Sequence, residues 1–84
     1  MIYFTTNMAT NLAHLHPGQF GLIKSVDVDQ SLTQRLYAMG FRVGKKIEII
    51  RQASFHGPLH LRIGTTDLMM RISDAQHIKV SPLV

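Results

Sequence analysis

Apolar and polar residues alternate along much of the chain with a period of two, which is the pattern of half-buried β-strands. The clearest example is the segment 59–63, where Leu59, Leu61 and Ile63 alternate with a histidine and an arginine. The same pattern predicts strands at 20–28, 46–53, 68–72 and 77–80, with one helical turn at 73–76 and Pro82 ending the last strand. The strands 59–63 and 68–72 flank a Gly-Thr-Thr-Asp turn, so they are predicted to form a hairpin.

One segment carries the period of a helix instead. Leu32, Leu36 and Met39 follow one another at i, i+4 and i+7, so they form one apolar stripe. Ser31 is followed three residues later by Gln34, the spacing of a capping box, in which both side chains bond to backbone N–H groups at a helix start. The sequence therefore predicts a helix that begins at Ser31.

The end of this helix is also marked. Gly40 can adopt the left-handed conformation after Met39, and Phe41 can pack back on Leu36, as a Schellman ending requires. A second turn follows at Gly44. We therefore expect the helix to stop at about Met39, and we expect these five residues to have structural roles.

Five strands with one short helix between the first and the second predict a small, mostly β domain. Closing such a bent antiparallel sheet would remove its exposed edges. Gly21 suggests a bend or bulge in the first strand, as in a sheet that curls into a barrel. We predict an SH3-like β-barrel at residues 12–84, with an OB-like barrel as the alternative, preceded by a flexible N-terminal arm at residues 1–11.

The composition fits a single small domain. The chain has 84 residues, of which 45% are hydrophobic, and it has no cysteine, so disulfide bonds and thiolate metal sites are excluded. No apolar run approaches the roughly 20 residues that span a bilayer, and the N-terminus lacks the pattern of a signal peptide, so we expect a cytoplasmic protein. The net charge is +4, but apart from Lys45 and Lys46 the basic residues are dispersed, unlike a nucleic-acid patch.

The sequence contains no catalytic motif that we can identify. Its glycines match neither the dinucleotide nor the P-loop spacing, and no Gly-x-Ser-x-Gly elbow occurs, so we expect neither an enzyme nor a cofactor. Histidine invites a sharper hypothesis, since His14 with His16, or His56 with His60, could bring two imidazoles together. Neither pair has a carboxylate nearby in the sequence, so we expect surface histidines and no metal site; a weak or shared metal site is the alternative.

Three motifs occur in an order that resembles a known family. They are Leu12-x-x-Leu15-x-Pro17-Gly18-Gln19-x-Gly21-x-Ile23, then Gln34-Arg35-Leu36-x-x-Met39-Gly40-Phe41-x-x-Gly44-x-x-Ile47, then Phe55-x-Gly57-Pro58. Together they resemble FeoA, the small cytoplasmic ferrous iron transport protein A. One departure is Val43, where such sequences often have proline.

The resemblance implies an SH3-like barrel that acts as an accessory protein to FeoB, the membrane ferrous iron permease with a cytoplasmic GTP-binding domain. The same fold also occurs as the C-terminal domain of iron- and manganese-dependent repressors. We expect the partner to bind at an exposed helix edge and turn, formed by Arg35, Tyr37, Arg42 and Lys45. The alternatives are a small basic nucleic-acid-binding barrel and a metal-binding module that uses surface histidines. Homodimerisation through a strand edge stays open.

Overall fold

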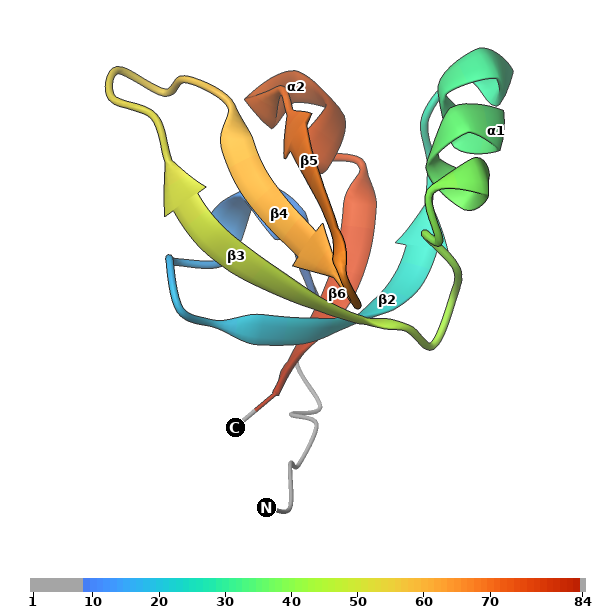
Figure 1. Cartoon of the computed structure of the whole chain (residues 1–84), viewed down its shortest axis with the longest axis horizontal. Coiled ribbons are helices and arrows are strands. Elements are labelled where there is room, and N and C mark those ends of the chain that lie inside the picture. The colour runs from blue at the N-terminus through green and yellow to red at the C-terminus, as the bar shows by residue number, and fades with distance from the viewer. Residues whose placement is uncertain (1–8, 84) are drawn as a thin grey trace.

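The computed structural model describes residues 9–83, which form a bent six-stranded antiparallel sheet with short helices around it (Figure 1). Along the sheet the strands lie in the order β1-β6-β2-β3-β4-β5. The elements in chain order are β1 (Thr10–Asn11), the 3-10 turn η1 (Leu12–His14), β2 (Phe20–Val26), α1 (Gln30–Ala38), β3 (Lys46–Gln52), β4 (Leu59–Ile63), β5 (Thr66–Met70), α2 (Ile72–Ala75) and β6 (Ile78–Leu83).

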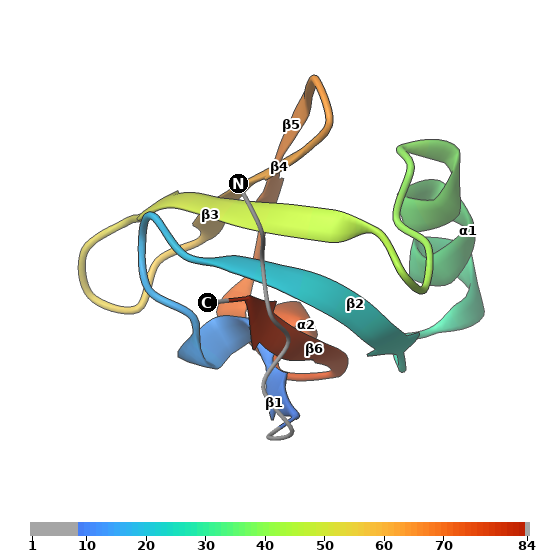
Figure 2. The same ribbon diagram turned by 90° about the horizontal axis from the view of Figure 1, so that it is seen from below.

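This architecture confirms the prediction of a mostly β fold with a short helix between the first two long strands. The sheet has one more strand than expected, because Thr10 and Asn11 pair with Val80 and Lys79 of β6. It is also not closed, since β1 and β5 lie at its two ends (Figure 2). A flexible N-terminal arm was predicted at residues 1–11, and residues 1–8 of it lie outside the described residues.

The first long strand contains a bulge, but not at Gly21. The register between β2 and β6 shifts between Ile23 and Ser25. Ile23 is fully buried and Leu22 only half-buried, so in the first half of β2 the face that carries Gly21 and Ile23 turns inward. Because the extra residue shifts the alternation by one, Val26 beyond the bulge packs against the core.

Pro82 does not end the last strand, contrary to expectation. It pairs with Gly21 of β2, and β6 continues to Leu83. The other neighbour of β6, β1, pairs only with Lys79 and Val80. At Pro82 the strand therefore has a described partner on one side alone, which is where a residue without an N–H is tolerated. The strand predicted at 68–72 also differs at its end: β5 stops at Met70, and Ile72 is the first residue of α2.

The core lies on the concave side of this sheet. Alternate strand residues enter it as the period of two predicts, including Ile47 and Ile49 of β3 and Leu59 and Leu61 of β4, all fully buried. Residues from η1 and from the end of α1 complete it. The buried apolar residues are Leu12, Leu15, Ile23, Leu36, Phe41, Ile47, Ile49, Leu59, Leu61, Ile63, Met70, Ala75, Ile78 and Val80.

Candidate functional site

The position of α1 is set first at its N-terminus. The N-cap residue is Asp29, whose Oδ1 accepts a hydrogen bond from the N–H of Leu32 at 2.8 Å. The predicted capping box at Ser31 and Gln34 is therefore wrong: the N-cap lies two residues earlier than predicted, and the helix begins at Gln30. Aspartate is as good an N-cap as serine. Asp29 lies three residues before the first apolar position of the helix, so the sequence also contained the correct N-cap, but the capping-box spacing favoured Ser31.

The C-terminus of α1 is as predicted. The N–H of Phe41 donates to the carbonyl of Leu36 at 2.9 Å, and the N–H of Gly40 donates to that of Tyr37 at 3.1 Å. Gly40 has φ +100°, in the region that favours glycine. These two bonds are the Schellman pattern, and they bury Phe41 completely in the core beside the helix.

The predicted contact residues Arg35, Tyr37, Arg42 and Lys45 are all exposed, and we call them the helix–turn face. The guanidinium carbon of Arg42 lies 5.9 Å from the centroid of the Tyr37 ring, a cation–π arrangement that joins the helix to the turn. The exposed fraction of Tyr37 is 40%, so its ring remains accessible.

Backbone bonds hold the turn that carries Arg42 and Lys45. The N–H of Lys45 donates to the carbonyl of Arg42 at 3.0 Å. Two further bonds tie the turn to β2: the N–H of Gly44 donates to the carbonyl of Ile23 at 2.8 Å, and the N–H of Ile23 donates to the carbonyl of Lys45 at 3.0 Å. The helix–turn face is therefore attached to the rigid sheet. Its role in binding stays a prediction.

The structure gives His60 the carboxylate partner that sequence inspection missed. Its Nε2 lies 2.9 Å from Oδ2 of Asp67, whose Oδ1 accepts from Nε of Arg62 at 2.6 Å. The bonds from Arg62 and then His60 hold the pKa of Asp67 far below its usual range, and the bond to Asp67 raises the pKa of Arg62. His60 and Asp67 are seven residues apart in the sequence, but their side chains meet across the β4–β5 hairpin. This contact can be recognised only from the register of the two strands.

The other candidate histidines occupy separate settings. Nδ1 of His14 is hydrogen-bonded to Oγ1 of Thr10 at 3.0 Å, and His16 and His56 are exposed. Within residues 9–83 no group of three or more histidine, cysteine or acidic side chains is placed to hold a metal ion.

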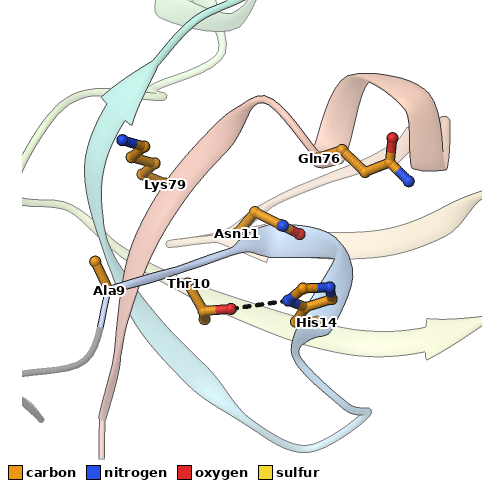
Figure 3. A pocket seen from close by; sticks show the side chains of 6 residues that line it. All are labelled: Ala9, Thr10, Asn11, His14, Gln76 and Lys79. Carbon is orange, nitrogen blue, oxygen red and sulfur yellow. Dashed lines mark hydrogen bonds between the residues drawn. The ribbon is translucent and has the colours of Figure 1, made fainter.

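His14 does line a pocket of about 370 Å³ between η1, α2 and β6 (Figure 3). The amide of Asn11 projects into this region, and its Oδ1 is buried without a hydrogen-bond partner, the single such side-chain atom in the part of the chain that the structure describes. The pocket is open to solvent. Its lining residues are Ala9, Thr10, Asn11, His14, Gln76 and Lys79.

A second concavity, of about 270 Å³, lies between α1 and the end of the β4–β5 hairpin, and we call it the α1–β5 groove. The sequence does not reveal it, because it depends on which strand lies at the sheet edge. Arg35 belongs both to this groove and to the helix–turn face. The groove is lined by Leu32, Arg35, Leu36, Met39, Leu68, Met69, Met70, Arg71 and Asp74.

Comparison with known protein families shows to which family the chain belongs. A model of the FeoA domain matches residues 10–82. The chain belongs to the FeoA family. No curated protein matches the sequence. Within residues 9–83, every helix is too short or too polar to cross a membrane.

Solved structures agree with this family. Iron(II) transport protein A from Clostridium thermocellum is 33% identical, with a TM-score of 0.79; the match covers 86% of this chain and 44% of that one. FeoA from Stenotrophomonas maltophilia is 25% identical, with a TM-score of 0.72 and coverage of 84% and 88%. That protein, solved with zinc, is described as a prokaryotic SH3 domain protein, which confirms the predicted SH3-like fold.

A manganese-dependent transcriptional repressor shares the fold as well. It is 19% identical, with a TM-score of 0.78, and the match covers 90% of this chain but 42% of the repressor. This likeness shows the fold alone, because one small barrel can serve unrelated functions. It confirms the expectation that such a domain also occurs in metal-dependent repressors.

Proposed function

We propose that this protein is an accessory factor of ferrous iron uptake that binds the cytoplasmic part of the FeoB permease and modulates its transport or GTPase activity. The observation that carries the proposal is the FeoA domain match over residues 10–82. It is supported by the names of two relatives, an iron(II) transport protein and a candidate activating factor of bacterial ferrous iron transport. In this proposal the protein is cytoplasmic and reaches the membrane through FeoB.

The helix–turn face supplies the chemistry for such binding. It presents one accessible aromatic ring, that of Tyr37, with the guanidinium of Arg42 over it. Two further basic residues of the face, Arg35 and Lys45, are also exposed. Tyrosine and arginine are among the residue types enriched at interface hot spots. Stacking on Tyr37 limits the rotamers of Arg42 before a partner arrives, which lowers the entropic cost of binding. The face therefore favours an acidic protein surface as its partner.

The test is binding of the full-length chain to the cytoplasmic domain of its own FeoB, measured by calorimetry with and without a non-hydrolysable GTP analogue. The double substitution Arg42→Glu/Lys45→Glu should lower the affinity by about tenfold or more and weaken its salt dependence, because it reverses two charges in the contact. The matched control Lys24→Glu/Arg51→Glu makes the same charge change at two exposed sites on β2 and β3.

The outcomes separate four cases. Nucleotide-dependent binding with a changed GTP hydrolysis rate identifies a regulator, and binding without a rate change identifies an assembly factor. If the wild-type chain does not bind either the cytoplasmic domain or intact FeoB in detergent, the proposed function is wrong. If the control pair weakens binding as much as Arg42→Glu/Lys45→Glu, general charge attraction rather than the helix–turn face explains the affinity.

A further inference from the structure

The two ends of the sheet differ in how they are protected. Natural edge strands are kept from pairing with other chains by being very short, or by proline, lysine or bulges. At one end β1 has only two residues. At the other end β5 has five residues, Thr66-Asp-Leu-Met-Met70, with neither proline nor lysine, and its register with β4 is continuous. Its single charged residue, Asp67, is bonded to Arg62 and His60 of β4.

The backbone of β5 also presents bonding groups on its open side. The two-residue turn Gly64–Thr65 joins Ile63 to Thr66, and such a turn closes on a hydrogen-bonded pair. Because bonded and non-bonded pairs alternate along an antiparallel ladder, Asp67 and Met69 direct their N–H and C=O groups away from β4. Among the described strands, β4 is the one that pairs with β5. An extended segment could therefore bond to Asp67 and Met69.

The α1–β5 groove lies along this same edge. In both overall views α1 stands beyond the β4–β5 hairpin on the right of the molecule (Figures 1 and 2). Leu32 of α1, the C-cap residue Met39 and Leu68 of β5 line the groove and are only partly buried. Met69 has an exposed fraction of 56%. A strand added to β5 would place alternate side chains on the groove side, where an apolar side chain would contact these residues.

The charges at the groove favour an acidic occupant. Two guanidinium groups, those of Arg35 and Arg71, line it together with one carboxylate, that of Asp74. Nε of Arg71 donates to Asp74 at 3.2 Å, yet the Arg71 side chain remains 79% exposed. No ion pair within residues 9–83 involves Arg35. Because two arginines and one aspartate line the groove, its net charge is positive, and an additional anion at the rim would be stabilised.

We propose that β5 and the α1–β5 groove bind an extended segment of a partner protein by strand addition, with a large apolar side chain in the groove and flanking carboxylates on Arg35 and Arg71. This is a recurring mode of peptide recognition, in which backbone bonds supply affinity and side-chain pockets supply selectivity. The proposal rests on the proposed function in taking FeoB as the first partner to test. The recognised segment itself is defined by its chemistry, a large apolar residue flanked by carboxylates.

The first experiment uses short peptides and needs no FeoB. A displayed library of random peptides is selected on the full-length chain, with counter-selection on the Met69→Pro/Arg71→Glu variant. The selected peptides should carry a large apolar residue flanked by Asp or Glu. Binding of a synthetic representative should slow amide hydrogen exchange at Asp67 and Met69, because their N–H groups become bonded. Failure to select any peptide, or peptides without acidic residues, would overturn the proposal.

Single variants then assign the contacts. Arg71→Glu should lower the affinity for the selected peptide about tenfold or more, whereas Arg71→Lys should retain most of it. Met69→Pro removes one outward N–H at an edge, where proline is tolerated, and should cost about tenfold. Arg51→Glu, on exposed β3 surface, should have no effect. If Met69→Pro unfolds the protein, the exchange measurement on the wild-type chain decides, and unchanged exchange at both amides refutes strand addition.

The FeoB domain provides the second arm. If it binds, and Arg71→Glu and Met69→Pro leave its affinity unchanged, the groove proposal is wrong while the proposed function stands. If neither this domain nor intact FeoB in detergent binds but acidic-apolar peptides do, the proposed function is wrong while the groove proposal stands. If the protein instead self-associates, and Met69→Pro abolishes this, a second copy of the chain occupies the edge and the proposed partner segment is wrong.

Discussion

Substitution of Gly40 tests whether the end of α1 depends on a left-handed backbone. Gly40 has φ +100°, and a Cβ added there would meet only Cγ2 of Ile63, at 3.7 Å, an ordinary contact. Gly40→Ala should therefore be unfavourable because of its backbone conformation and not because of crowding. An L-residue in this region costs roughly 1–2 kcal/mol, which for a domain of this size lowers Tm by about 5–10 °C.

The assay is thermal unfolding followed by circular dichroism, with two comparison variants. Gly44→Ala also places an L-residue at positive φ, +89°, with no atom within 4 Å, so it should lose a similar amount. Gly40→Asn should lose less than Gly40→Ala, because asparagine adopts left-handed conformations more readily. If Gly40→Ala unfolds at the wild-type temperature, or if the asparagine variant loses as much as the alanine variant, the conformational argument is wrong.

Three further substitutions test other parts of the structure. Asp29→Ala removes the N-cap of α1 and should destabilise the protein by about 1 kcal/mol in urea unfolding, whereas Ser31→Ala should change it little. Phe41→Ala removes a fully buried ring and should cost about 3–5 kcal/mol, measured in the same way. Asp67→Asn tests the pH dependence: its folded-state pKa lies below the unfolded value of about 3.9, so acid favours unfolding. The Tm advantage of wild type over Asp67→Asn should be constant at neutral pH and decline as the pH falls below about 4, and an advantage that persists in strong acid would contradict the ion-pair assignment.

Sequence patterns predicted correctly those elements whose formation depends on residues that are neighbours in the chain. The alternation of Leu59, Leu61 and Ile63 specifies a half-buried strand, and the order of Gly40 and Phe41 specifies a Schellman ending, because both depend on neighbouring residues. The N-cap of α1 was predicted two residues late because two capping patterns overlap, and only the bond from the N–H of Leu32 to Asp29 distinguishes them.

Features that depend on strand pairing could not be predicted in the same way. The bulge near Lys24 reverses which residues of β2 face inward, and its position follows from the register with β6. Two residues, Thr10 and Asn11, are too few to show a period, so β1 is recognisable only from its partner. The Asp67 ion pairs were accessible in principle, since a two-residue turn after Ile63 places Asp67 opposite Arg62.

The two candidate surfaces share one structural cause, the placement of α1. Its cap at Asp29 and its left-handed end at Gly40 fix both termini of a helix that has little more than two turns, and so is marginal without the rest of the fold. One side of the helix then contributes Tyr37 to the helix–turn face, and another contributes Met39 to the groove. Arg35 belongs to both surfaces, so a partner held by strand addition at β5 would also lie within reach of the helix–turn face. A single acidic partner could thus use one short helix as the centre of its contact, while the open sheet edge fixes its direction.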